Sequence, residues 1–305
     1  MKVMVTVDLF GVLDDTPRKL LSNFEVEYNK KNKKYSSEEL KDNLKNFNPD
    51  IIIAGTEKYN EEVLNCCPNL KMISRVGIGL DSIDLNECKK RGIFVANTPD
   101  APSNAVADLI VGQIINMLRE IQNVDSSIRK GVWERYIGKE ICECNIGIIG
   151  YGRIGRLVKK RLEAFNPKKI LINDIDEDQL KELSPEEICT KDKIYQNSDI
   201  ISIHIPYNPQ NYNLITEKEL EKMKPNTLLL NFSRGGIINE EDLFKWLEKN
   251  EHAKCAIDVF IEEPYYGELI KLKNSFLTPH LGSCSKKSRN DMEVGAVRNV
   301  LEFLK

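Results

Sequence analysis

Runs of apolar residues alternate with amphipathic segments along almost the whole chain. Ten of these runs are short, nearly continuous and rich in isoleucine, valine and leucine, which is typical of strands that are covered on both faces. Because such strands alternate with helical patterns, we expect an α/β fold of parallel sheets with helices on both faces. The predicted strands span residues 2–8, 50–55, 70–76, 93–97, 145–150, 168–174, 199–206, 227–233, 253–260 and 275–279.

Helix signals lie between the apolar runs. SPEE (184–187) and TEKE (216–219) each place Ser or Thr three residues before Glu, so each has the pattern of a capping box and predicts a helix start. Residues 101–124 are apolar over much of their surface and predict a helix buried between two units, with PDAP (99–102) as a candidate hinge. Residues 285–305 predict a helix whose apolar stripe packs on a neighbouring domain. That stripe consists of Val294, Val297, Leu301 and Leu304.

The charge of the chain limits its classes of partner. The 305 residues are enough for two domains or one large one, and 41% are hydrophobic and 30% charged. The net charge is −3, so no basic field is present to hold nucleic acid or an anionic membrane surface. We therefore expect neither nucleic acid nor a membrane as a partner.

The N-terminus and the cysteines bear on localisation. Asp8 interrupts the apolar start, so residues 1–10 predict a first strand rather than a signal peptide. No apolar run approaches the roughly 20 residues that span a bilayer. The eight cysteines form no C-x-x-C pair, which argues against a zinc site and against a disulfide framework. Free thiols fit a reducing cytosol, so we expect a cytoplasmic protein without a metal site.

The sequence GIIGYGRIGR (147–156) contains three spaced glycines after a predicted strand and at the start of a predicted helix. This is the context that a dinucleotide-binding motif requires. Gly150 would allow the tight turn, Gly152 would let the backbone approach a pyrophosphate, and Gly155 would let helix and strand pack closely. The helix N-terminus would then bind the phosphates through its free N–H groups.

Asp174 ends the next predicted strand, 24 residues after Gly150. A carboxylate at this place accepts hydrogen bonds from the hydroxyl groups of the adenosine ribose. The residues that follow, 175–178, include three acids and no arginine, so a 2′-phosphate would meet negative charge. The sequence therefore favours NAD over NADP. A Rossmann unit alone does not name a reaction, and an S-adenosylmethionine binder or a nucleotide sensor could share it.

Three residues that suit acid–base chemistry follow later strands. Arg234, Glu263 and His280 each lie just beyond a predicted strand, where open parallel sheets bind ligands. A guanidinium holds a carboxylate or a polarised carbonyl through paired hydrogen bonds. An imidazole can hand a proton to a carbonyl oxygen, and a carboxylate beside it fixes the ring. We therefore expect these three side chains to form one site.

With these residues in view, the chain resembles the D-isomer-specific 2-hydroxyacid dehydrogenase family. The matching blocks run in family order from about residue 50 to 285. They are RVGIGLDSIDL (75–85), NTPDAPSNAVAD (97–108), GIIGYGRIG (147–155), HIPYNPQNYNLI (204–215), MKPNTLLLNFSRGG (223–236), AIDVFIEEP (256–264) and LTPHLG (277–282).

The resemblance assigns roles to particular residues. It makes Arg234, Glu263 and His280 catalytic, and it makes Val76 and Gly77 the loop whose N–H groups bind the substrate carboxylate. It implies that Asp258 holds the nicotinamide amide. The remaining cofactor contacts that it implies are Ser103, Gly150, Gly152, Arg153, Ile154, Gly155, Asp174, His204 and Pro206.

The resemblance also implies two Rossmann-like or flavodoxin-like domains, with the cofactor domain inserted into the substrate domain. We expect residues 1–98 and 284–305 to form the substrate domain and residues 99–283 to form the NAD-binding domain. A homodimer built on the cofactor domain is implied as well, with residues 101–124 as an interface.

The expected reaction is reversible hydride transfer between nicotinamide and C2 of a short D-2-hydroxy acid. Blocks 51–64 and 71–85 look most like 3-phosphoglycerate dehydrogenases, which open serine synthesis. Lys58 and Arg75 are candidates to contact the phosphate, although Ala54, Gly55 and Thr56 replace arginines that some of those enzymes carry. Glyoxylate, hydroxypyruvate and D-lactate are the alternative substrates.

A functional alternative of a different class is an NAD-sensing corepressor that resembles the C-terminal-binding-protein group. That group retains the Arg, Glu and His set, so these three residues do not distinguish it from an enzyme. It adds disordered tails, which this sequence lacks.

Overall fold

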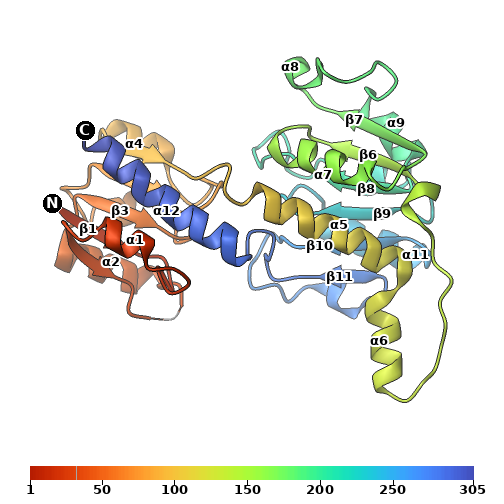
Figure 1. Ribbon diagram of the computed structural model, residues 1–305, viewed down its shortest axis with the longest axis horizontal. Coiled ribbons are helices and arrows are strands. Elements are labelled where there is room, and N and C mark those ends of the chain that lie inside the picture. Colours follow the sequence, from red (N-terminus) through yellow and green to blue (C-terminus); the bar gives the residue numbers. More distant parts are fainter. Residues whose placement is uncertain (32) are drawn as a thin grey trace. The chain divides into compact units, whose positions relative to one another are not determined.

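The computed structural model describes residues 1–31 and 33–305, and they form two compact units (Figure 1). Unit 1 consists of Met1–Pro102 and Cys284–Lys305, and unit 2 of Ser103–Ser283. Along the chain, unit 2 is therefore inserted into unit 1. Both units are α/β structures built on a parallel sheet, as the apolar pattern predicted.

The sheet of unit 1 has five parallel strands in the order β2-β1-β3-β4-β5. They are β1 (Lys2–Val5), β2 (Glu25–Tyr28), β3 (Ile51–Ala54), β4 (Met72–Arg75) and β5 (Phe94–Ala96). The helices of this unit are α1 (Thr16–Leu20), α2 (Ser37–Phe47), α3 (Glu61–Leu64), α4 (Leu85–Lys90) and α12 (Lys286–Phe303).

The central strand β3 shows how this sheet is covered on both faces. All four of its residues are fully buried, and alternate side chains enter different cores. Ile52 packs in a core with residues of α2 and α3, and Ile53 in a core with residues of α1 and α12. The α12 residues in that core are Met292, Ala296, Val297 and Val300.

The sheet of unit 2 has six parallel strands in the order β11-β10-β9-β8-β6-β7. They are β6 (Asn145–Ile149), β7 (Lys169–Asn173), β8 (Ile200–Ile203), β9 (Leu228–Asn231), β10 (Lys254–Ile257) and β11 (Ser275–Leu277). The chain runs from β6 to one neighbour, β7, and then across to the other, β8. The carboxyl end of β6 is therefore a topological switch point, the place where such sheets bind ligands.

Helices cover both faces of this sheet. On one face α5 (Ser103–Arg119) packs along α7 (Arg153–Glu163), and on the other lie α9 (Lys191–Asn197), α10 (Glu217–Leu220) and α11 (Glu240–Lys249). The remaining elements are α6 (Ile121–Arg129), η1 (Ile141–Glu143), α8 (Glu177–Leu180) and η2 (Glu268–Lys271). Among the described residues, no helix is long and apolar enough to cross a membrane.

The structure contains all ten predicted strands and adds one, β2. The predicted start of α10 at Thr216 is confirmed, with both capping-box contacts present. The segment 101–124 is not one helix: it divides at Glu120, whose φ is 53°. At the break, Lys254 pairs with Glu120 and donates a 2.8 Å hydrogen bond to the Met117 carbonyl. The predicted C-terminal helix is α12, which packs on the sheet of unit 1.

The helix predicted from SPEE is absent. Residues 185–187 form a turn, although Ser184 still donates to Glu187 through its N–H and its hydroxyl at 3.1 Å each. The chain then pairs with β7, because the Ile172 N–H donates to the Glu187 carbonyl and Ile172 bridges Ile188. Pairing at the sheet edge thus overrides the local helix signal.

Candidate active site

The glycine loop after β6 has the geometry that the sequence predicts. Gly150 has a φ of 95°, and a Cβ built on it would lie 2.5 Å from the carbonyl oxygen of His204. A Cβ on Gly155 would lie 2.2 Å from the Gly150 carbonyl oxygen, so α7 approaches the strand too closely for any other residue. The turn and the helix contact each require glycine.

Gly152 differs from its neighbours because it faces open space. A Cβ built on it would have no atom within 4 Å. Gly152 is also the N-cap of α7 and supplies no side-chain cap. The N–H groups of the first turn, which begins with Arg153 and Ile154, are therefore directed at an open region at the positive end of an 11-residue helix. This arrangement fits a dinucleotide pyrophosphate.

Asp174 lies just beyond β7, and its side chain is hydrogen-bonded to the glycine loop. Its carboxylate accepts the Tyr151 N–H at 2.5 Å and the Asp176 N–H at 2.9 Å. These bonds hold the carboxylate beside the glycine turn while leaving lone pairs for ribose hydroxyl groups. Ile175, directly after it, is 92% exposed.

His204, Pro206 and Ser103 complete the predicted cofactor contacts. His204 follows β8, donates its N–H to the Ile149 carbonyl at 2.7 Å, and has a buried Nε2 without a hydrogen-bond partner among the described residues. Burial lowers the pKa of His204 to about 3, so the ring is neutral at physiological pH. The Pro206 carbonyl accepts from Asn211 at 2.8 Å, and Ser103 begins α5 with only 3% of its surface exposed.

Arg234 lies in the loop after β9, beside the loop that carries Glu263. A Cβ on Gly235 would lie 2.0 Å from the Phe260 carbonyl oxygen, so the two loops touch through backbone atoms. The half-buried guanidinium donates from Nη1 to the Ser233 carbonyl at 2.7 Å. Its positive charge is close enough to lower the pKa of Glu263.

Glu263 and His280 are hydrogen-bonded to each other in this site. His280 Nδ1 lies 3.0 Å from Oε2 and 3.2 Å from Oε1 of Glu263. Burial of Glu263 raises the pKa of its carboxyl, but the hydrogen bond with His280, the charge on that ring and the Phe260 N–H together outweigh it. The net pKa is lowered, so Glu263 is ionised at neutral pH. Because Nδ1 is held by Glu263, Nε2 is the ring nitrogen of His280 that would serve a substrate.

Asp258 positions the histidine loop. Its buried carboxylate accepts the Thr278 hydroxyl at 2.5 Å and the N–H groups of Leu281 and Gly282 at 2.7 and 2.8 Å. His280 lies between these anchors with a φ of 54°, a left-handed conformation that costs a non-glycine residue free energy. The family resemblance implies only a nicotinamide contact for Asp258, whereas in the structure its carboxylate also anchors the loop that carries the predicted proton donor.

The four predicted substrate contacts lie in unit 1, at the carboxyl ends of β3 and β4. Lys58 is exposed in the loop after β3, and Arg75 ends β4 with its Nε donating to the Gly79 carbonyl at 3.1 Å. The Val76 N–H already donates to the Ala54 carbonyl at 3.0 Å. The Gly77 N–H donates to Thr98 Oγ1 at 2.8 Å.

In the structure, these two N–H groups are hydrogen-bonded within unit 1. The next two N–H groups on the same loop, those of Ile78 and Gly79, donate to no other residue in the part of the chain that the structure describes. That Val76 and Gly77 bind the substrate carboxylate stays a prediction.

Comparisons with known proteins identify the family of this chain. The NAD-binding domain of D-isomer-specific 2-hydroxyacid dehydrogenases matches residues 111–282. A glyoxylate reductase from Thermococcus litoralis is 36% identical over 265 residues, which cover 84% of this chain and 80% of that protein. A hydroxypyruvate reductase from Thermotoga maritima is 32% identical over 286 residues, covering 90% of this chain and 92% of that protein.

Solved structures share the whole fold. The TT0316 protein from Thermus thermophilus superposes with a TM-score of 0.87 at 28% identity, over 100% of this chain and 97% of that one. Both the glycine loop and the Arg–Glu–His set fall within the matched NAD-binding domain. The chain therefore belongs to the D-isomer-specific 2-hydroxyacid dehydrogenase family and is an NAD-dependent oxidoreductase.

Proposed function

We propose that this enzyme reduces glyoxylate or hydroxypyruvate, with NADH as the electron donor, to the corresponding 2-hydroxy acid. The observation that carries the proposal is the pairing of an ionised Glu263 with His280 Nδ1 at 3.0 Å, beside Arg234. Relatives named glyoxylate and hydroxypyruvate reductase support this substrate class.

In the proposed mechanism, the residues of this chain bind the acid and move one proton. Bound NADH supplies the hydride that reaches C2. The Arg234 guanidinium holds the carboxylate and the carbonyl oxygen of the acid. His280 donates its Nε2 proton to that oxygen as charge develops on it, while Glu263 holds the ring through Nδ1.

The 3-phosphoglycerate reading of the sequence has less support than the alternative. Ala54, Gly55 and Thr56 stand where some phosphoglycerate dehydrogenases carry arginines, which leaves Lys58 as the cation of the loop after β3. The relatives compared above carry the names of glyoxylate and hydroxypyruvate reductases. Serine synthesis is therefore not part of the proposal.

A substrate panel tests the proposed function. NADH oxidation would be followed with glyoxylate, hydroxypyruvate, pyruvate and 3-phosphohydroxypyruvate at matched concentrations. We expect the highest kcat/KM with glyoxylate or hydroxypyruvate. A clear preference for 3-phosphohydroxypyruvate, or no turnover of any of the four acids, would contradict the proposal.

Replacing Glu263 with glutamine should lower kcat for reduction. The ionised carboxylate accepts from His280 Nδ1 and fixes the orientation of the ring, and a neutral amide makes a weaker hydrogen bond there. The measurement is kcat for glyoxylate at neutral pH, and an unchanged kcat would show that Glu263 does not position His280.

We also propose that the enzyme is a homodimer that associates through unit 2. Figure 1 shows α6 and the segment after it extending from the body of this unit. None of the α6 residues is buried, and Trp133 and Ile137 are 81% and 95% exposed. Apolar side chains from this region line a groove, and a contiguous apolar surface of this kind marks an interaction site. These side chains are Ile115, Ile121, Val124, Ile128, Trp133 and Ile137.

A charge at the centre of this surface should separate the subunits. We expect light scattering after size exclusion to give the mass of two chains for the unmodified protein and of one chain for Trp133→Asp. The matched control is Ile270→Asp, a change at another exposed apolar residue of unit 2, which should stay dimeric. A monomeric unmodified protein at micromolar concentration would count against the dimer.

A further inference from the structure

The loop that carries Glu263 lies at the surface and is held by few contacts. Residues 261–264 are all exposed. Of the three N–H groups of residues 261–263, only that of Ile261 donates a hydrogen bond within the part of the chain that the structure describes. An exposed loop with few contacts opens readily, yet the Glu263 carboxylate has to stay 3.0 Å from His280 Nδ1. The position of Glu263 therefore depends on how this loop is anchored.

The anchor is Glu240, the first residue of α11. Its Oε1 accepts the Ile261 N–H at 2.8 Å, and a hydrogen bond to an ionised acceptor is stronger than one between neutral groups. The preceding residue, Phe260, donates its own N–H to Glu263 Oε1 at 3.2 Å. Two adjacent N–H groups of one loop thus join Glu240 on one side to Glu263 on the other.

Helix α11 does not need the Glu240 side chain to cap its own N-terminus. Asn239 is the N-cap residue, and its side chain accepts the N–H groups of Glu241 and Asp242 at 3.1 Å each. Burial and the nearby Glu262 raise the pKa of Glu240, and the Ile261 N–H opposes them. The contact with the loop is therefore what favours an ionised carboxylate at this place.

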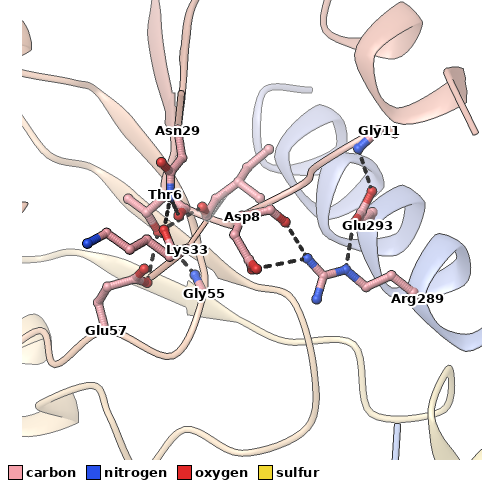
Figure 2. Close-up of polar contacts among 10 residues, drawn as sticks. Thr6, Asp8, Gly11, Asn29, Lys33, Gly55, Glu57, Arg289 and Glu293 are labelled. Atoms are coloured by element: carbon pink, nitrogen blue, oxygen red, sulfur yellow. Dashed lines mark hydrogen bonds and ion pairs between the residues drawn. The ribbon is translucent and has the colours of Figure 1, made fainter. Parts of the chain in front are cut away.

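Figure 2 shows a contact of the same kind in unit 1. There Glu293 of α12 accepts the Gly11 N–H at 2.8 Å and so ties a loop to a helix. Glu293 is also paired with Arg289 at 2.7 Å. Within residues 1–31 and 33–305, no ion pair includes Glu240, so its carboxylate serves the loop rather than a charge network.

We propose that Glu240 is a positioning residue: by accepting the Ile261 N–H, it fixes the loop 260–264 and so holds the Glu263 carboxylate in place for the proton donor. This inference rests on the proposed function. Glu240 acts only through the loop, and it contacts neither the acid nor the cofactor. Its removal should therefore affect the rate of the reaction more than the binding of either.

Replacing Glu240 with alanine tests this role. We expect kcat for glyoxylate reduction to fall about tenfold or more, because small displacements of reacting groups are costly. KM for glyoxylate and the affinity for NADH should change less than about twofold. The matched control is Glu241→Ala, which removes the same charge from the next position of α11, where Glu241 pairs with Lys245. That variant should keep full activity.

Two conservative variants separate the hydrogen bond from the charge. Glu240→Gln keeps an oxygen that can accept the Ile261 N–H and should retain at least about half of kcat. Glu240→Asp keeps the charge at the start of α11 but is one methylene group shorter, so it should lose several-fold in kcat. The aspartate variant also replaces the alanine variant in this test if the latter fails to fold.

A double variant tests whether Glu240 acts through Glu263. Glu263→Ala leaves no carboxylate to position, so adding Glu240→Ala to it should lower kcat by less than about twofold further. A further tenfold loss would overturn the inference, as would an unchanged kcat in a folded Glu240→Ala or an equal loss in Glu240→Gln. In each of these cases glyoxylate reduction by the unmodified enzyme stands. No turnover of glyoxylate or hydroxypyruvate by the unmodified enzyme would instead remove the proposed function and this inference with it.

Discussion

Replacing His280 with alanine should lower kcat for glyoxylate reduction by about 100- to 10,000-fold, the range that a positioned general acid contributes. The reason is geometric. Glu263 binds Nδ1 of His280, and the Asp258 carboxylate fixes the loop by accepting the N–H groups of Leu281 and Gly282. Nε2 is therefore the ring nitrogen that would face a substrate. Removing the ring leaves water as the proton donor, while the glycine loop and Asp174 remain unchanged.

The control for this experiment is His252→Ala, which changes an exposed histidine at the start of the segment leading to β10. That variant should keep full activity. NADH affinity, measured by fluorescence titration, should be nearly the same in both variants and in the unmodified enzyme. If His280→Ala bound NADH normally and kept more than a tenth of the original kcat, His280 would not be the proton donor.

The strands could be predicted because a buried parallel strand is a short continuous apolar run, as β3 and β9 show. The missed strand, β2, is an edge strand with the sequence EVEY, in which two glutamates alternate with Val26 and Tyr28. This alternation is typical of a strand covered on one face, but only four residues of it do not stand out beside the continuous apolar runs. The helix predicted from SPEE (184–187) is absent because the chain there pairs beside β7. This pairing is a tertiary interaction that local capping residues do not reveal.

The candidate site could be predicted where residues follow strands in a fixed order. Arg234, Glu263 and His280 come after β9, β10 and β11, which are neighbours in the sheet. The sequence could not show that the Val76 and Gly77 N–H groups are already bonded, because those partners, Ala54 and Thr98, are about 20 residues away.

Replacing Arg234 with lysine should lower kcat/KM for glyoxylate by about 100-fold or more, even though the positive charge is kept. A guanidinium presents two parallel donors to a carboxylate, and an ammonium group cannot reproduce that fork. Arg234→Ala removes the charge as well. Loss of one partner of a hydrogen-bonded charge pair costs about 2 to 5 kcal/mol, which corresponds to roughly 30- to 4,000-fold, so kcat/KM of this variant should fall toward the upper end of that range.

The kinetic pattern should distinguish Arg234 from His280. Because the guanidinium contacts the acid both before and during hydride transfer, the lysine variant should show a raised KM as well as a lowered kcat. The alanine variant of His280 should lose mainly kcat. Arg298→Lys changes an exposed arginine of α12 and should leave both constants unaltered. If Arg234→Lys retained the original KM and kcat, Arg234 would contribute charge to the Glu263–His280 pair without binding the substrate.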